Sequence, residues 1–264
     1  MTFELLVSCV KKDAHELAEK MNIASDAVIV SQLEEKESDE FFDIGENRIL
    51  SIKSQTRGVG LNRNICIDHA SADIILFADE DIVYDEGYAE KVLKEFSDHP
   101  DADAIFFNVR VCEERRTYWN EDYKPVKWYN SGRYPAYSIA VRASKLKAAG
   151  VKYSLLFGGG AKYSNGEDSL FINDMRKAGF RMLASPVVLG EEVPRPSTWF
   201  NGYNDKLFYD RGVLYHFLYG PWAMLWGFRW VYKMRPEYEK DYPYKKARQI
   251  LFQGIKDAAS GKLE

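Results

Sequence analysis

The chain has 264 residues, of which 46% are hydrophobic and 14% aromatic, a composition that excludes a disordered or fibrous protein. With 36 basic and 40 acidic side chains, it lacks the excess positive charge on which nucleic-acid binding depends. Cys9, Cys66 and Cys112 show no C-x-x-C spacing and cannot all pair, so we expect neither a disulfide framework nor a zinc ribbon, and a cytoplasmic location. Met1–Val10 lacks the features of a signal peptide, so we do not expect secretion.

Short apolar runs alternate with helical patterns through the first half of the chain, which is typical of a parallel sheet with crossover helices. The runs predict strands at Phe3–Cys9, Ala27–Val30, Ile49–Ile52, Ile74–Ala78 and Ala104–Val111. Apolar residues at helical spacing predict helices between them, at Ala14–Met21, Gly60–Ala70 and Asp85–Phe96.

The second half begins with an irregular stretch, residues 112–134, that is aromatic and charged and predicts a long loop or a short antiparallel excursion. We then expect a strand at Ile139–Arg142 and helices at Ser144–Ala149 and Gly166–Ala178. Phe180–Leu189 predicts one or two edge strands broken at Pro186. The last predicted helix is Tyr244–Ala258.

The strongest motif is the apolar strand Ile74–Ala78 that runs into Asp79, Glu80 and Asp81. Open α/β sheets bind ligands beyond the carboxyl ends of their strands, and closely spaced carboxylates repel one another unless a cation lies among them. A divalent metal site and a charged turn are both open interpretations. A second Asp-x-Asp spacing, at 101–103, falls in a predicted turn and indicates a solvated loop.

The segment from Arg57 to Asn64 is a glycine-containing turn that opens a helix. A glycine such as Gly60 lets the backbone approach a phosphate, the helix start offers N–H groups, and Arg57 and Arg63 add guanidinium donors. Taken in isolation, an ordinary strand-to-helix turn is the better explanation of the glycines. The position one strand before the acidic triplet favours a diphosphate site.

A third motif places Gly166, Glu167 and Asp168 at the start of a predicted helix, behind the glycine run 158–160. Acidic residues at a helix N-terminus interact favourably with the macrodipole, which is a purely structural interpretation. The functional interpretation is a carboxylate at the mouth of a glycine loop that acts as a general base.

Together, the three motifs resemble family 2 glycosyltransferases of the GT-A fold, over residues 3 to about 190. The resemblance implies a doubly wound mixed β-sheet flanked by helices, as a catalytic domain at 1–200. Within it, residues 1–110 would form the nucleotide half and 111–200 the acceptor half. An aromatic-rich helical extension, 201–264, would follow.

The same resemblance implies an inverting, metal-dependent transfer of a sugar from a nucleotide diphosphate sugar to an acceptor hydroxyl, in the synthesis of a cell-surface polysaccharide or glycolipid. Asp168 matches the base that takes the acceptor proton, and Glu167 would help to place the acceptor. Asp81 matches the ligand of Mn²⁺ or Mg²⁺ on the donor diphosphate, with Asp79 near the ribose and the metal. We expect a UDP-sugar donor and a carbohydrate or lipid-linked glycan acceptor. The expected donor contacts are Ser8, Val10, Gln32, Arg57, Gly60, Arg63, Asp79 and Glu80.

Two features depart from the family pattern. Gln32 stands near the end of the second strand, where members commonly carry Asp residues that recognise the nucleotide base, so it either binds a uracil or simply ends a strand. No His follows the strand after the base helix. Glu191 or His216 would then complete the metal site, unless fewer protein ligands suffice.

Two other functions stay open. A sugar nucleotidyltransferase would share the sheet and the metal carboxylates, but it would need a Gly-rich basic loop after the first strand, where this chain has Ser8–Lys12. A catalytically silent carbohydrate-binding protein of the same fold would not need Asp168.

The C-terminal region is rich in aromatic residues. Ser197–Tyr209 suits stacking on a sugar, or packing against the catalytic domain. Gly220 and Pro221 interrupt the apolar stretch Val213–Tyr232, which argues against a membrane-spanning helix. Three alternatives stay equally open: an interfacial helix at the inner face of a membrane, a homodimer contact, or packing on the catalytic domain. In the first, the basic contacts to lipid headgroups would come from Arg229, Lys233, Arg235, Lys245, Lys246 and Arg248.

Overall fold

A computed structural model describes residues 1–194 and 202–263 of the chain. The chain divides into two compact units. The first contains residues 1–155 and the chain from Glu167 up to the undescribed segment. The second contains residues 156–166 together with everything after that segment. The glycine-rich stretch before Asp168 therefore belongs to the second unit, a division that the sequence motifs do not reveal.

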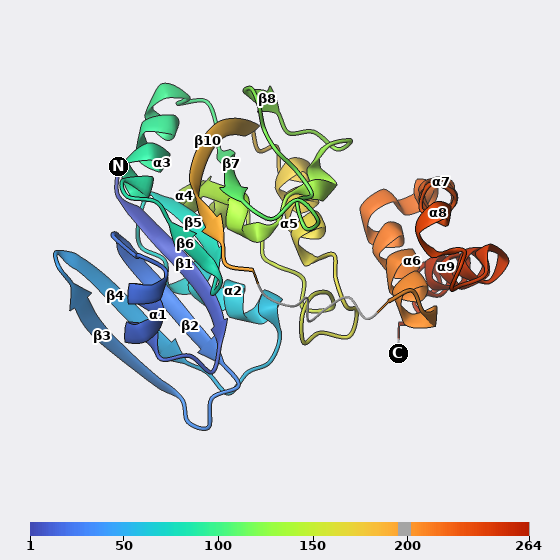
Figure 1. The fold of residues 1–264 in the computed structure, drawn as a ribbon, viewed down its shortest axis with the longest axis horizontal. Helices are drawn as coiled ribbons and strands as arrows, with labels where there is room; N and C mark the ends of the chain where they lie inside the picture. Colours follow the sequence, from blue (N-terminus) through green and yellow to red (C-terminus); the bar gives the residue numbers. More distant parts are fainter. Residues whose placement is uncertain (195–201, 264) are drawn as a thin grey trace. The chain divides into compact units, whose positions relative to one another are not determined.

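Ten strands of the described chain form one mixed sheet in the first unit (Figure 1). They are β1 (Phe3–Val10), β2 (Asp26–Gln32), β3 (Ser38–Ile44), β4 (Asn47–Lys53), β5 (Ile74–Asp79), β6 (Ile82–Tyr84), β7 (Ala104–Arg110), β8 (Lys124–Pro125), β9 (Ile139–Arg142) and β10 (Met182–Glu192). The order is β3-β4-β2-β1-β5-β9-β7-β10-β6, with β8 paired to β10. β4, β2, β1 and β5 run parallel, whereas β9 lies antiparallel between β5 and β7.

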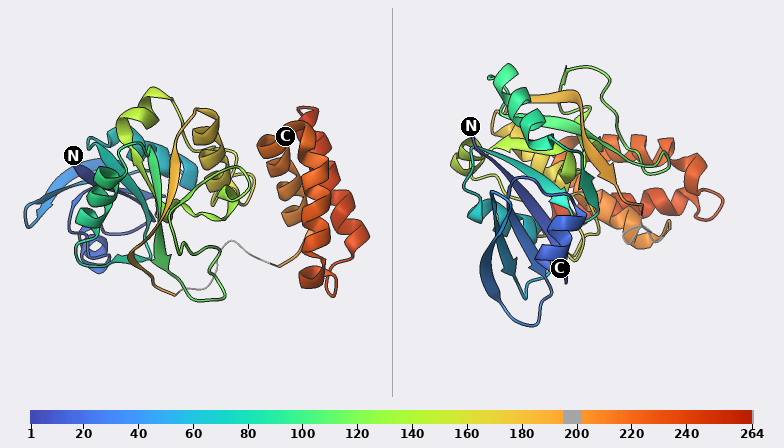
Figure 2. Two further views of the ribbon diagram at one scale, coloured as in Figure 1. Left: turned by 90° about the horizontal axis from the view of Figure 1, so that it is seen from above. Right: turned by 60° about the vertical axis from the view of Figure 1, so that its left-hand side comes forward.

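Helices cover both faces of this sheet, as two further views show (Figure 2). They are α1 (Ala14–Lys20), α2 (Val59–His69), α3 (Tyr88–Asp98), α4 (Ala143–Ala148) and α5 (Glu167–Lys177), with short 3₁₀ turns η1 (Ser131–Arg133) and η2 (Ala136–Ser138). Side chains of α1 and α3 pack with Leu5 in one core, and those of α2, α4 and α5 pack with Leu6 in the other. Because alternate strand residues point to opposite faces, one buried strand contributes side chains to both cores. The predicted doubly wound α/β class is confirmed.

Three strands differ from expectation, and one of them is the short β6, which was not predicted. β3 is a largely exposed edge strand, so its sequence carries no apolar alternation and was not predicted. β10 is one continuous strand between β7 and β6, and the prediction of broken edge strands at Pro186 was wrong. The register of β10 against β7 shifts between Ala184 and Val188, so an irregularity in the ladder accommodates the proline, which cannot donate a ladder hydrogen bond.

The second unit is helical. Its elements are α6 (Asp205–Tyr219), η3 (Gly220–Trp222), α7 (Ala223–Lys233), α8 (Arg235–Tyr238) and α9 (Tyr244–Ala259). The backbones of α6 and α9 approach so closely that a Cβ atom on Gly212 would lie 2.1 Å from the carbonyl oxygen of Leu251. The predicted interruption at Gly220 is confirmed, since α6 ends there with φ 52°. Within the described ranges, no helix is both long and apolar enough to cross a membrane.

Candidate active site

Polar side chains gather where the central parallel strands of the first unit end. Ser8 lies opposite Asp79 in the β1–β5 ladder, and Val10 lies opposite Gln32 in the β1–β2 ladder. The carboxyl ends of β1, β2 and β5 therefore meet at one edge of the sheet, which is where open α/β sheets bind ligands.

The guanidinium group of Arg63 joins this edge to the start of α5. Arg63 lies on α2, with only 5% of its side chain exposed. It donates from Nη2 to Oδ1 of Asp79 and from Nη1 to Oδ1 of Asp168, both at 2.8 Å. A carboxylate oxygen of Glu167 lies 3.7 Å from Nη1. One buried cation thus holds together the acidic strand end and the predicted base.

Neighbouring carboxylates stabilise the charge on Arg63. Burial by itself lowers the pKa of Arg63, but Asp79 and Asp168 more than offset burial, so the pKa lies well above the ordinary arginine value. The ring centre of Tyr153 is 5.1 Å from Cζ of the guanidinium group, a cation–π distance. Arg63 is therefore a permanent, well-oriented positive charge within the site.

Asp168, the second residue of α5, titrates near neutral pH. Its Oδ2 accepts a hydrogen bond from the backbone N–H of Ala136 at 3.1 Å, and 23% of its side chain is exposed. Burial is the largest cause that raises the pKa of Asp168 to about 7; Arg63 opposes the rise, whereas Glu167 and Asp79 add to it. Because three carboxylates share one guanidinium group, a proton on Asp168 is favoured. Such a group can accept a proton close to neutral pH.

Packing of α2 against the segment at Tyr153 fixes the position of Arg63. The side chain of Asn64 donates to the carbonyl oxygen of Tyr153 at 2.9 Å and accepts from its N–H at 2.8 Å. A Cβ atom on Gly60 would lie only 2.4 Å from the carbonyl oxygen of Ser154, so this approach requires glycine. The sequence predicted that a phosphate would approach Gly60. In the structure, the backbone of Ser154 is what approaches Gly60. The contact of Gly60 with a donor phosphate stays a prediction.

Other predicted donor contacts hold the strand ends and loops together. The Oε1 of Gln32 accepts a hydrogen bond from the N–H of Gly58 at 2.8 Å and so links the end of β2 to the start of α2. Glu80 accepts from the N–H of Val10 at 3.0 Å, across β1 and β5. Arg57 is exposed. The structure brings these side chains to the same edge of the sheet, and their contacts with a donor stay predictions.

Asn62 is a residue of this edge that the sequence analysis missed. It is buried on α2, and its Nδ2 donates to Oγ of Ser8 at 2.8 Å and to the carbonyl oxygens of Cys9 and Val30 at 3.2 and 2.9 Å. Asn62 thereby connects β1, β2 and α2, and it engages the predicted donor contact Ser8. The sequence signal was an amide on the sheet-facing side of the glycine-containing helix.

Asp81 is buried, and β6 follows it directly. In the β6–β10 ladder, Glu192 lies opposite Ile82, the neighbour of Asp81. The predicted metal ligand Glu191 is exposed and lies 3.6 Å from Nε of Arg110. Over residues 1–194 and 202–263, no three His, Cys, Asp or Glu side chains are arranged to hold a metal ion by themselves. The part of Glu191 in metal binding stays a prediction.

Tyr137 and Glu192 are further residues that the sequence analysis missed. Burial raises the pKa of Tyr137, and the charges of Glu192, Asp79 and Asp81 add to the rise. Glu192 is itself buried and forms an ion pair with Arg115 at 2.7 Å. Tyr137 comes from the 3₁₀ turn η2 and Glu192 from the end of β10, so only the fold brings them to the acidic triplet.

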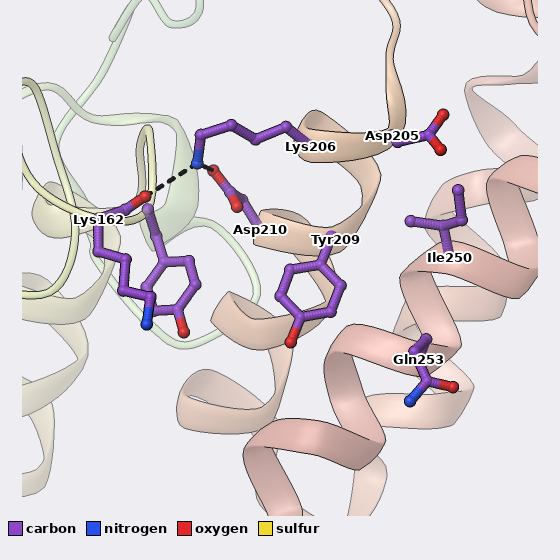
Figure 3. Close-up of a pocket in the computed structure, with 8 residues that line it drawn as sticks. Lys162, Asp205, Lys206, Tyr209, Asp210, Ile250 and Gln253 are labelled. Carbon is purple, nitrogen blue, oxygen red and sulfur yellow. Dashed lines mark hydrogen bonds and ion pairs between the residues drawn. The ribbon is translucent and has the colours of Figure 1, made fainter. Parts of the chain in front are cut away.

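The second unit has a pocket of its own, of about 460 Å³ (Figure 3). Buried Asp210 accepts hydrogen bonds from the N–H and Oγ of Ser164 at 2.9 and 2.8 Å and from Nζ of Lys206 at 2.6 Å. Lys206 also donates to the carbonyl oxygen of Lys162 at 2.8 Å. These bonds tie residues 156–166 to α6. The pocket is lined by Lys162, Tyr163, Asp205, Lys206, Tyr209, Asp210, Ile250 and Gln253.

Two predictions concern the region around α6. His216, the alternative metal ligand, lies on α6 of the second unit with its ring edge-on to Phe217, and its part in metal binding stays a prediction. The proposed sugar contacts at 197–201 lie outside the described residues, whereas Tyr209 lines the pocket and donates a hydrogen bond to Asp257 at 3.0 Å.

Solved structures similar to this chain have the GT-A fold of glycosyltransferases. TarS of S. aureus, residues 1–349 with UDP-GlcNAc, matches with a TM-score of 0.60 at 13% identity, over 91% of this chain and 74% of that one. The same portion with UDP gives 0.57 at 13% identity, over 98% and 72%. The mannosyltransferase PcManGT of Pyrobaculum calidifontis, with GDP-Man and Mn²⁺, gives 0.52 at 12%, over 98% and 87%. At these identities the likeness establishes the fold.

The sequence itself matches a family model. The model described as "Glycosyl transferase family 2" matches residues 31–151, a segment that contains Arg63 and the acidic triplet and ends before Asp168. A comparison with curated proteins finds no match. The resemblance to family 2 glycosyltransferases is therefore confirmed by the family model and by the fold.

Proposed function

We propose that this protein is an inverting, metal-dependent glycosyltransferase that moves a sugar from a nucleotide diphosphate sugar to an acceptor hydroxyl. The observation that carries the proposal is the contact of one guanidinium group, Arg63, with both Asp79 at the end of β5 and Asp168 at the start of α5. The family resemblance assigns the first carboxylate to the donor side and the second to the acceptor side. A cation bound to both carboxylates holds Asp79 and Asp168 at a fixed separation.

Asp168 is the general base of the proposed reaction. Its pKa of about 7 lets the unprotonated form exist at neutral pH while keeping enough basicity to take a proton from a sugar hydroxyl. The hydrogen bond from Ala136 and the ion pair with Arg63 fix the orientation of its carboxyl group. Glu167 lies beside Asp168 at the helix start, and its proposed role is to bind an acceptor hydroxyl.

The proposed divalent ion would be bound jointly by carboxylates at the acidic edge and by the phosphates of the donor, rather than by protein side chains alone. Hard ions such as Mg²⁺ are commonly held by one or two carboxylates together with substrate phosphates. Asp81 would hold the ion and Asp79 would lie close by. When bound, Mn²⁺ or Mg²⁺ would neutralise charge that develops on the departing diphosphate. Asp168 has a separate task, which is to orient and deprotonate the acceptor.

The donor is proposed to be a UDP-sugar, with GDP-sugars as the alternative. TarS was solved with UDP-GlcNAc and with UDP, and PcManGT with GDP-Man and Mn²⁺. Gln32 closes β2 where a base-recognising residue is expected, and its hydrogen bond to Gly58 leaves the amide NH₂ group of the same side chain to serve as a donor to a uracil. We propose residues 1–200 as the catalytic domain and 201–264 as a helical extension, with which residues 156–166 form one compact unit.

The acceptor is proposed to be a carbohydrate or a lipid-linked glycan, in the synthesis of a cell-surface polysaccharide or glycolipid on the cytoplasmic side of the membrane. This part of the proposal rests on the family resemblance. The aromatic loop between β7 and β9, with exposed Trp119, Trp128 and Tyr129, offers ring faces suited to sugar stacking.

A thermal-shift panel of nucleotide sugars tests the function. UDP-sugars and GDP-sugars are added to the whole chain with Mn²⁺, with Mg²⁺ and with a chelator. A ligand that binds only the native state raises the Tm, so we expect at least one sugar nucleotide to do so only when a metal is present. The matched control is free sugar with free metal, which should not shift the Tm. If no sugar nucleotide raises the Tm under any condition, the proposed function is wrong.

A further inference from the structure

Helix α7 of the second unit is apolar on two faces. Its inner face is formed by Ala223, Gly227 and Val231, all buried and spaced four residues apart. A Cβ atom on Gly227 would lie 2.6 Å from a methyl group of Leu251, so this face is pressed against α9. The inner face therefore accounts for the packing of α7 in its unit.

The outer face of α7 is apolar as well, although it is exposed. Trp222, at the start of the helix, is 66% exposed, and Leu225, Phe228 and Tyr232 are 57%, 44% and 60% exposed. Their spacing of three and four residues places them in one stripe. Scattered exposed apolar residues are ordinary, but a continuous stripe with two aromatic ends indicates an interaction surface.

Positive charge accompanies this stripe. Residues 211–236 contain no Asp or Glu, and residues 202–263 carry eleven basic and six acidic side chains, in a chain whose net charge is −4. Arg229 and Lys233 lie on the exposed surface of α7, whereas Arg235, which follows, is paired with Glu239. The outer face thus combines apolar and cationic groups, which is the pattern of helices that lie in the headgroup region of anionic membranes.

We propose that the outer face of α7 docks on an anionic lipid surface, with the helix axis parallel to the bilayer. Trp222 and Tyr232 are at the two ends of the stripe, and such amphipathic rings favour the membrane–water interface. A second copy of this chain is a poorer partner for the outer face of α7, because a two-fold contact would bring Arg229 and Lys233 of both copies close together. This inference does not rest on the proposed function.

Co-sedimentation with lipid vesicles tests the proposal. Wild-type protein should sediment with vesicles of phosphatidylcholine that contain about 30 mol% phosphatidylglycerol, and much less with pure phosphatidylcholine. Phe228→Ser should lower the partition coefficient roughly tenfold, because one aromatic side chain is no longer buried in lipid. Arg229→Gln together with Lys233→Gln should lower binding to the anionic vesicles more than tenfold and leave the weak binding to neutral vesicles unchanged.

Phe41→Ser is the matched control, since Phe41 is equally a phenylalanine, is 59% exposed, and lies on β3 of the first unit. It should bind vesicles as wild type does, and circular dichroism checks that each variant is folded. The proposal is overturned if wild type does not sediment with anionic vesicles, or if Phe41→Ser and Phe228→Ser weaken binding equally. It is also overturned if sedimentation velocity shows a dimer that Phe228→Ser dissociates and no vesicle binding occurs.

Discussion

The chain contains two Asp-x-Asp spacings whose surroundings differ. Asp79 and Asp81 follow a fully buried parallel strand, and Asp79 shares the guanidinium group of Arg63 with two other carboxylates. Asp101 and Asp103 stand in the turn between α3 and β7. The same spacing therefore occurs at a strand end that faces other acidic groups and in a surface turn.

The second pair is neutralised locally. Asp103 accepts from Nζ of Lys145 at 2.6 Å and from the N–H of Arg181 at 2.7 Å, and the side chain of Arg181 lies 3.1 Å from Asp101. Here cations match carboxylates, whereas Asp79 shares the guanidinium group of Arg63 with Glu167 and Asp168. An excess of negative charge at a strand end is what a cationic ligand can use. The balance of charge, rather than the spacing, distinguishes a candidate site from a structural turn.

Replacing the proposed base should have the largest effect. We expect Asp168→Asn to lower kcat by roughly 10²–10⁴-fold and to leave donor affinity nearly unchanged, because a general base acts on the acceptor proton. The matched control is Asp174→Asn, since Asp174 is a partly exposed carboxylate on the same helix, paired with Lys177 at 3.4 Å. Initial rates of nucleoside diphosphate release measure both variants. Wild-type turnover in Asp168→Asn would refute the assigned role.

Removing Asp81 should weaken donor binding. Asp81→Ala should lower the affinity for the responsive nucleotide sugar by about 10²-fold in the presence of Mn²⁺, because a ligand of the bridging ion is lost. Asp101→Ala carries the same change in the other Asp-x-Asp and should bind as wild type does. Isothermal titration calorimetry compares them, and equal affinities would contradict the distinction between the two pairs.

The pH dependence of the rate should report on Asp168. Because the base acts without its proton and its pKa is about 7, kcat/KM should fall about tenfold per unit as the pH drops below that value and level off above it. The charged or titratable groups that face Asp168 are Arg63, Glu167, Asp79 and Tyr153. Glu167→Gln should move the midpoint to lower pH by removing a neighbouring negative charge. A profile that stays flat from about pH 5 to 7 would count against this base.

We expect the smallest effect on activity from substitutions at Asp101 and Asp103, the second Asp-x-Asp pair. Asp103→Ala should lower the free energy of unfolding by about 1–3 kcal/mol, because the N–H of Arg181 and the ammonium group of Lys145 lose their acceptor. The rate of the folded enzyme should not change. Urea unfolding combined with the activity assay separates the two quantities, and a loss of donor binding in this variant would make the second pair functional.

Much of the fold could be predicted from local patterns. β5, β9 and the helices that begin near Glu167 and Tyr244 were found because their apolar residues recur at strand or helix spacing. β3 was missed, because an exposed edge strand has no buried face to impose alternation. The continuity of β10 was missed, because proline usually ends a central strand.

The candidate site could be predicted only in part. Asp79, Asp81 and Asp168 were singled out because each stands at the end of a regular element. The tie between Asp79 and Asp168 was not foreseen, because Arg63 reaches Asp168 across 105 residues of sequence. Tyr137 likewise comes from the short 3₁₀ turn η2, which no apolar periodicity in the sequence marks. Local patterns locate the groups, and the long-range fold decides which of them meet.

Anomalous scattering from a crystal grown with Mn²⁺ and a nucleoside diphosphate is the most direct test of the central claim. We expect one manganese peak beside the carboxylate of Asp81, in contact with the diphosphate, and with Asp168 in the same site. A peak at Asp101 and Asp103, or a nucleotide bound away from the end of β5, would contradict it.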